Sequence, residues 1–197
     1  MAMRSADRHN PRQKKPPKPL DHARLEELAL AYVARFATSA AKLEAYLARK
    51  LRERGWEGED EPDIPALVSR YAGLGYVDDA SYARAKAGGL LRRGYGPRRV
   101  NQALNAAGIS QEIREGLRAG RGEQRRAALA LARKRRFGPF AAAPADRAIR
   151  EKQIAAMLRA GHSLDNIREL VDAPSPEAAE EWAVGADEAG PEEEEWS

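Results

Sequence analysis

Residues 71–109 read YAGLGYVDDASYARAKAGGLLRRGYGPRRVNQALNAAGI, and this stretch decides the fold. It contains the end of one helix, a complete helix, a tight turn and a further helix, with arginines gathered at the turn. Asp78 and Asp79 stand immediately before the complete helix, where a carboxylate caps free N–H groups and favours the positive end of the helix dipole. Pro97 suits the first turn of the last helix. We therefore interpret the two carboxylates as a helix start and residues 94–96, GYG, as a turn.

Apolar side chains recur at helical spacing through much of the chain. One apolar face comprises Ile64, Leu67, Val68, Tyr71 and Leu74. Positions separated by three, four and seven residues lie on one side of a helix, so these side chains predict an amphipathic helix. No convincing run alternates between apolar and polar residues, which is the pattern of a half-buried strand. The predicted fold class is all-α.

Three glycines mark a repeat. Gly55, Gly108 and Gly161 lie 53 residues apart, and each closes a stretch of helical character. Glycine readily takes the left-handed conformation that ends a helix. Ser110 and Ser163 follow the second and third glycines at the same distance, where each is placed to cap the next helix. In the first copy the connection is longer, and Asp63 is the predicted cap.

Adding the helix before each such pair produces three units of three helices. Units of this size bury little apolar surface alone and must pack on their neighbours, which predicts an elongated array with a groove or curved face. The predicted divisions are a disordered basic arm over 1–22, repeat 1 over 23–77, repeat 2 over 78–120, repeat 3 over 121–172 and a disordered acidic tail over 173–197.

Both ends of the chain have the composition of disordered segments. The N-terminal arm contains QKKPPKP and almost no large apolar side chain, so burial cannot offset the entropy of ordering it. The tail is rich in Pro, Ala, Gly and Glu and ends in EEEEWS. Ser175 and Pro176 form a potential start for a short helix over 176–184. The acidic tail either solubilises the chain or competes with DNA for the basic residues.

Positive charge is concentrated in the middle of the chain. The formal net charge is +4, but residues 85–150 hold 16 Lys and Arg against 4 Asp and Glu, whereas residues 173–197 hold 9 Asp and Glu and no Lys or Arg. Four arginines converge on the 94–96 turn without a nearby acid, although a merely solvated face normally mixes signs. We favour a surface that faces an anion, either DNA phosphate or an acidic protein surface. Its predicted residues are Arg92, Arg93, Arg98, Arg99, Arg125, Arg126, Arg133, Lys134, Arg135 and Arg136.

The composition argues against several kinds of chemistry. The chain has no Cys, so it offers neither disulfides nor thiolate ligands. Its 3 histidines lie outside any Ser/His/Asp arrangement, and no metal-ligand spacing or nucleotide-binding fingerprint is present. No apolar run reaches about 18 residues, and the N-terminus lacks a signal-peptide core. We therefore expect a monomeric cytoplasmic binding protein with no membrane segment, cofactor, metal or catalytic residues.

Four sequence pieces occur in the order and spacing of a known signature. They are LGYVDD at 74–79, SYAR at 81–84, GYGPRR at 94–99 and a closing L-x-x-x-G-I at 104–109. Together they resemble the RecX family of bacterial modulators of the RecA recombinase. The signature residues are Gly75, Tyr76, Asp78, Asp79, Tyr82, Ala83, Gly96, Leu104, Gly108 and Ile109. The resemblance covers roughly residues 23–172, is strongest in repeat 2, and implies three tandem three-helix repeats.

For function, the resemblance implies a negative modulator of RecA that acts in DNA repair and homologous recombination. Such a protein binds in the groove of the RecA–DNA filament and inhibits filament extension, ATP hydrolysis, strand exchange and the coprotease activity of the SOS response. The expected partners are the RecA filament and single- or double-stranded DNA.

Two other classes of protein remain open. One is a helix-turn-helix DNA-binding regulator whose recognition helix spans 97–107. The other is an α-repeat scaffold that binds peptides. Sequence-specific DNA binding without RecA would favour the first class, and salt-insensitive binding to a peptide would favour the second, because phosphate contacts are strongly salt-dependent.

Overall fold

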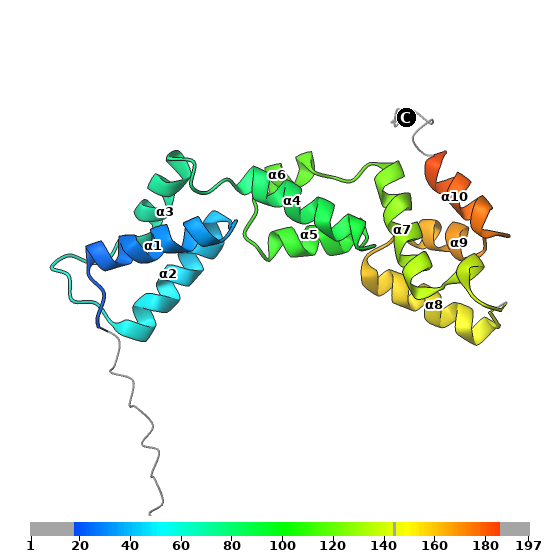
Figure 1. Cartoon of the computed structure of the whole chain (residues 1–197), viewed down its shortest axis with the longest axis horizontal. Coiled ribbons are helices and arrows are strands. Elements are labelled where there is room, and N and C mark those ends of the chain that lie inside the picture. Colours follow the sequence, from blue (N-terminus) through cyan, green and yellow to red (C-terminus); the bar gives the residue numbers. More distant parts are fainter. Residues whose placement is uncertain (1–17, 144, 186–197) are drawn as a thin grey trace, which may run out of the picture.

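The computed structural model describes residues 18–143 and 145–185, so the predicted disorder over 1–17 and 186–197 falls outside the described residues. Within the described part of the chain, ten α-helices and one short 3₁₀-helix form the fold and there is no strand, which confirms the all-α prediction. Figure 1 shows three groups of helices that follow one another along the long axis of the molecule. The array is therefore elongated.

The first unit consists of α1 (His22–Arg35), α2 (Ala40–Arg54) and α3 (Ile64–Gly73). Each helix is capped by a side-chain oxygen that accepts the backbone N–H of the residue three positions further on. The three capping residues are Asp21, Ser39 and Asp63. Asp63 is thus the cap that the sequence predicts. The core between the helices is built mainly from Leu25, Ala29, Leu43, Leu47, Ile64, Leu67, Val68, Tyr71 and Val77.

The first unit includes residues that lie before its predicted boundary. Leu20 is fully buried in the first core. Its N–H donates to the carbonyl of Gly55 at 2.9 Å, and its own carbonyl accepts the N–H of Glu57 at 2.8 Å, so it pairs with Trp56 as an isolated bridge. The structure corrects the predicted arm at residues 20–22, because one large apolar side chain is buried and both backbone groups of Leu20 find partners.

The second unit consists of α4 (Asp79–Arg92), α5 (Pro97–Asn105) and α6 (Gln111–Gly116). Pro97 is the first residue of α5, and Ser110 caps α6 by accepting the N–H of Ile113, as the sequence predicts. The core is made of mostly small side chains, so this unit is a thin layer. Its buried residues are Ala83, Ala87, Val100, Leu104, Ala107 and Ile109.

The third unit consists of α7 (Arg121–Arg135), α8 (Arg147–Ala160) and α9 (Leu164–Val171), with the short helix η1 (Gly138–Phe140) between α7 and α8. Ser163 caps α9, as predicted, by accepting the N–H of Asn166. The buried core of this unit comprises Ala128, Leu129, Ala132, Met157, Ile167, Leu170 and Val171, together with two alanines of a fourth helix.

That fourth helix is α10 (Pro176–Val184), which packs on α7 and α9. It confirms the short helix expected at 176–184, with Ser175 as its cap. Ala179 and Ala183 are fully buried in the third core. The structure therefore corrects the predicted end of the third unit at residue 172, because α10 completes the apolar core of that unit.

The three repeat glycines all have a positive backbone angle. Their φ values are 78° for Gly55, 73° for Gly108 and 96° for Gly161. Side chains with a Cβ are strained in this region, whereas glycine is not. Each glycine follows the second helix of its unit, so the periodicity in the sequence marks the same bend three times.

Candidate functional site

Direct hydrogen bonds join the first unit to the second. Ser39 is fully buried, and its Oγ donates to the carbonyl of Ala107 at 2.6 Å. Asp79 Oδ1 accepts the N–H of Ala40 at 2.8 Å. A Cβ on Gly108 would lie 2.2 Å from the Cβ of Ala41, so the two units approach as closely as a glycine permits.

The two carboxylates of the signature serve different helices. Asp78 caps α4, as predicted, by accepting the N–H of Ser81 at 2.9 Å. Hydrogen bonds from the Ser81 hydroxyl and backbone lower the pKa of Asp78. Asp79 instead binds the N–H of Ala40, at the first residue of α2 in the preceding unit. One carboxylate therefore starts its own helix, and the other fixes that helix to its neighbour.

The GYG turn joins the second unit to the third. The N–H of Gly96 donates to the carbonyl of Ala160 at 2.9 Å, and the N–H of Arg98 donates to the carbonyl of Gly161 at 3.2 Å. A Cβ on Gly96 would lie 2.4 Å from the carbonyl carbon of Gly161, so only a hydrogen fits there. The turn predicted at residues 94–96 is thus also the surface on which the third unit docks.

His162 lies in this second joint. Its side chain is fully buried, and its Nε2 lies 3.0 Å from the carbonyl oxygen of Gly94. Burial lowers the pKa of His162, while the hydrogen bond to Gly94 acts in the opposite direction. Nδ1 finds no partner within the described residues. A neutral ring with its proton on Nε2 fits this environment, because that proton is donated to the Gly94 carbonyl.

Both joints use equivalent positions of the repeat. In each joint the donor is the residue just before the second helix of one unit. The acceptor is the carbonyl of the residue just before the repeat glycine of the next unit. Ser39 does so through its hydroxyl to Ala107, and Gly96 through its backbone N–H to Ala160. The repeated positions therefore join neighbouring units and also end or begin the helices within each unit.

Among the described residues, no three-helix unit precedes the first repeat glycine, and its carbonyl is covered by a single residue instead. The carbonyl of Gly55 accepts the N–H of Leu20 at 2.9 Å, just as the carbonyl of Gly161 accepts the N–H of Arg98. Leu20 thus makes the contact with the first repeat glycine that a neighbouring unit makes with the third.

Seven of the ten predicted basic residues are free to contact a partner. All seven are exposed, and none makes a side-chain hydrogen bond or an ion pair within residues 18–143 and 145–185. Four of them flank the GYG turn, and we call them the junction arginines: Arg92, Arg93, Arg98 and Arg99. The other three lie at the C-terminal end of α7, and we call them the α7 terminal cluster: Lys134, Arg135 and Arg136.

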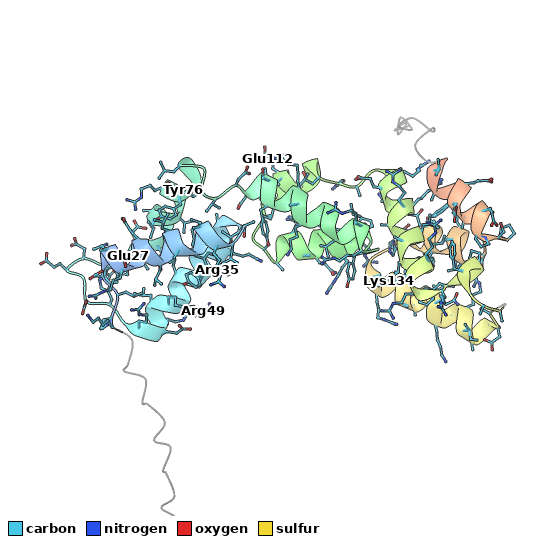
Figure 2. The ribbon with its side chains drawn as sticks, viewed as in Figure 1. Glu27, Arg35, Arg49, Tyr76, Glu112 and Lys134 are labelled. Carbon is cyan, nitrogen blue, oxygen red and sulfur yellow. The ribbon has the colours of Figure 1, made fainter. Side chains whose placement is uncertain are left out.

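The second joint brings these two groups toward each other. A Cβ on Gly94, which follows Arg93, would lie 2.8 Å from the backbone N of Leu131 in α7. Lys134 and Arg135 stand three and four residues after Leu131 and therefore lie one helical turn further along the same side of α7. Figure 2 shows Lys134 near the lower end of α7, beside this joint.

Two other predicted cations hold α10 in place. Arg125 Nη1 donates to the carbonyl of Trp182 at 2.9 Å, and its guanidinium lies 4.8 Å from the centre of the indole ring. Arg133 forms an ion pair with Glu180 and lies 5.7 Å from the ring of Phe140. The structure thus assigns Arg125 and Arg133 intramolecular partners that the sequence did not indicate. The last predicted cation, Arg126, lines a small hollow together with Arg92 and Glu123.

The remaining signature residues are structural or partly exposed. Ala83, Leu104 and Ile109 are buried in the second core. Tyr82 is partly buried between Lys42 and Lys86, whose ammonium groups lie 5.3 and 5.6 Å from its ring. Burial raises the pKa of Tyr82, but the two lysines outweigh burial and lower it overall.

Tyr76 and Gly75 shape the exposed turn after α3. Tyr76 is 54% exposed, and its ring lies 5.6 Å from that of Tyr71. Gly75 has a φ of 78°. This tyrosine therefore lies at the edge of the first core and presents much of its ring to solvent.

Sequence reasoning missed one group of side chains on the first unit. Three aromatic rings and two arginines line a hollow between α1 and α2. Their spacing offered a signal, since Tyr32 and Phe36 are four residues apart and Arg49 follows Tyr46 by three. Tyr32 and Tyr46 were not predicted as site residues because they share helices with the apolar core, and Phe36 because it follows one of these helices.

Within the part of the chain that the structure describes, no group of three or more His, Asp or Glu is placed to hold a metal ion. Among the same residues, no helix combines the length and the apolar character needed to cross a membrane.

Comparison with known proteins finds the same signature. Residues 78–116 match the family described as RecX, second three-helix domain. The regulatory protein RecX of Myxococcus xanthus is 30% identical over 175 residues, which cover 84% of this chain and 94% of that protein. The regulatory protein RecX of Thermus thermophilus is 39% identical over 87 residues, which cover 44% of this chain and 58% of that protein.

The fold has solved counterparts as well. The crystal structure of RecX from Lactobacillus salivarius superposes with a TM-score of 0.59 at 20% identity, over 76% of this chain and 96% of that chain. Because the similarity to the Myxococcus protein spans most of both sequences, this chain belongs to the RecX family of regulatory proteins.

Proposed function

We propose that this protein binds the RecA–DNA filament and restrains it. Binding would inhibit filament extension and, with it, DNA-dependent ATP hydrolysis, strand exchange and the SOS coprotease activity of RecA. Membership of a family of regulatory proteins supports a regulatory role. The observation that carries the proposal is the set of open cations at the second joint, which is suited to a polyanionic partner.

The shape of the molecule supports a filament as that partner. Hydrogen bonds cross both joints, and at the second joint the backbones of Gly96 and Gly161 lie in close contact, so the three units follow one another in an extended array. An extended body can touch several subunits of a helical polymer at once, which gives a high effective concentration for each further contact. The junction arginines and the α7 terminal cluster would face DNA phosphate or acidic side chains of the filament.

The geometry supports this role better than major-groove recognition by α5. A recognition helix contacts bases with residues near its N-terminus. Here the N-terminus of α5 is docked on the third unit through the N–H groups of Gly96 and Arg98. The start of α5 is therefore engaged in the joint between two units.

The deciding measurement is single-stranded-DNA-dependent ATP hydrolysis by the cognate RecA, titrated with this protein. The proposal expects strong inhibition at amounts far below one molecule per RecA subunit. A variant with all four junction arginines changed to Gln should need at least about tenfold more protein for the same inhibition, since each removed charge weakens contact with a polyanion. Absence of inhibition by the unaltered protein at equimolar amounts would overturn the proposal.

A control variant removes two exposed arginines that lie outside the proposed surface. Arg52 and Arg147 are also exposed, and they lie in α2 and at the start of α8. Changing both to Gln should leave inhibition within about twofold of the unaltered protein, because these residues lie outside the proposed surface.

A further inference from the structure

A hollow on the first unit combines flat aromatic surfaces with positive charge. It is lined by side chains of α1, of the residue after α1, and of α2, and Figure 2 shows Arg35 and Arg49 beside these helices. This place is far along the array from Lys134, so it is separate from the second joint (Figure 2). Its lining residues are Ala31, Tyr32, Arg35, Phe36, Tyr46 and Arg49.

The rings form a continuous strip across the two helices. Tyr32 of α1 and Tyr46 of α2 are stacked, with ring centres 4.2 Å apart and an angle of 20° between their planes. The ring of Phe36 lies 5.3 Å from that of Tyr32 at an angle of 51°. The stacking covers one face of each tyrosine ring, so the exposed aromatic surface comes mainly from Phe36 at the end of the strip. Exposed aromatic faces offer stacking surfaces that do not depend on the identity of a base.

Cations stand over both ends of this strip. The guanidinium of Arg35 lies 5.4 Å from the centre of the Phe36 ring, and that of Arg49 lies 5.7 Å from the centre of the Tyr46 ring. No carboxylate lines the hollow. The residues that line the hollow therefore present rings and positive charge together.

Packing within the protein accounts for only part of this arrangement. Tyr32 and Tyr46 pack against the first core with part of their surface. Phe36, in contrast, is 47% exposed. Arg35 makes no ion pair within the described residues, and Arg49 has only Glu53, at 3.6 Å on an exposed surface where water screens the pair.

We propose that this hollow binds single-stranded nucleic acid. One or two bases stack on the strip of Phe36 and tyrosine rings, and Arg35 and Arg49 contact the flanking phosphates. Duplex DNA keeps its base faces stacked inside the helix and cannot offer them. An acidic peptide could pair with the arginines but would leave the rings uncovered. The proposal concerns a site on the first unit and does not rest on binding to RecA.

The test measures binding of full-length protein to labelled oligonucleotides by fluorescence anisotropy, in the absence of RecA and at low salt. The probes are a thymidine oligonucleotide, its uridine RNA counterpart, a duplex of equal length, and an abasic oligonucleotide with the same phosphates. We expect the thymidine or uridine strand to bind at least about fivefold more tightly than the abasic strand, because base stacking is lost in the latter. Equal binding of the abasic strand would overturn the proposal.

Substitutions at Phe36 separate stacking from simple charge attraction. Phe36→Leu keeps an apolar side chain and should weaken single-strand binding at least about fivefold, whereas Phe36→Trp should retain it. Leu30 is 49% exposed on the same helix and does not line the hollow, so Leu30→Ala is the matched control and should bind normally. Unaltered binding by Phe36→Leu would also overturn the proposal.

The outcome is independent of the proposed action on RecA. The same Phe36 variants are assayed in the RecA ATP-hydrolysis titration described above. Loss of single-strand binding with full inhibition of RecA would support the hollow as a separate site. Failure of the unaltered protein to inhibit RecA would refute the proposed function without affecting the anisotropy result.

Discussion

Ser39 at the start of α2 and Ala107, two residues after α5, are joined by a hydrogen bond of 2.6 Å, which links the capping of one helix to the docking of two units. The same hydroxyl oxygen accepts the N–H of Lys42 at 3.4 Å. A single buried side chain thus starts its own helix and holds the next unit. A hydroxyl suits this double role because it can donate and accept at once, whereas a carboxylate cap could only accept.

Changing Ser39 to Ala should lower the free energy of unfolding by about 2 kcal/mol, because both the cap and a buried hydrogen bond are lost and the Ala107 carbonyl is left without its partner. Urea unfolding measures the change. Ser110 caps α6 on an exposed surface without contacting another unit, so Ser110→Ala should cost about 1 kcal/mol or less. Equal losses of free energy of unfolding in the two variants would show that the hydrogen bond to Ala107 adds no stability.

Changing Gly96 to Ala should loosen the second joint, because the new Cβ would lie 2.4 Å from the carbonyl carbon of Gly161. The backbone there can move away only at a large cost in free energy. We expect a destabilisation of about 2 kcal/mol or more and a measurable change in the small-angle X-ray scattering profile. Gly120 precedes α7 and has open space around its Cα. Gly120→Ala is the control, and it should leave the scattering profile unchanged.

Acid should weaken the second joint through His162. Burial lowers the pKa of His162 below its ordinary value of 6.5. As the pH falls through about 6.5, the unfolded chain binds a proton at this residue and the folded chain does not, so the contribution of the neutral ring is complete above that pH and declines below it.

The test for His162 is the free energy of unfolding at pH 7.5 and 5.5, compared between the unaltered protein and His162→Gln, which keeps a donor for Gly94. The variant should show a smaller decline. Asp78 and Asp172 have lowered pKa values and affect stability only at more acidic pH. Identical declines in the two proteins would contradict a role for the buried ring.

Helix α10 should depend on Trp182. Changing Trp182 to Ala removes the ring under Arg125 and apolar contact with the third core, and we expect a loss of about 2 kcal/mol in the free energy of unfolding. Hydrogen exchange of the α10 amides should become faster. Trp182→Phe keeps a ring and should lose less. Val184 is 60% exposed, so Val184→Ala serves as the baseline, and a Trp182→Ala effect no larger than this would refute the prediction.

Local sequence was enough to predict much of the fold. Helix starts at Asp63, Asp78, Ser110 and Ser163 follow from side chains that satisfy free N–H groups three residues on, which is a short-range property. The repeat of Gly55, Gly108 and Gly161 was visible for the same reason, since each position needs a positive φ. Family resemblance could also be read from residues 71–109 alone.

The role of the individual site residues could not be read in this way. The sequence places Asp78 and Asp79 side by side, yet one caps α4 and the other binds Ala40 in another unit. Arg125 and Arg93 look alike in the sequence, but α10 covers the first and leaves the second open. Partners more than 30 residues away decide these differences, and spacing along the chain carries no information about them.

By itself, the sequence of this protein determined the helical class, the helix starts, the repeat and the regional charge, because capping, periodicity and composition act over a few residues. Only the tertiary structure decided which glycines carry the joints, which arginines stay open to a partner, and that Tyr32 and Tyr46 stack into one surface. Those properties depend on which faces of different helices pack together. That packing is decided by the burial of side chains that are distant in the chain.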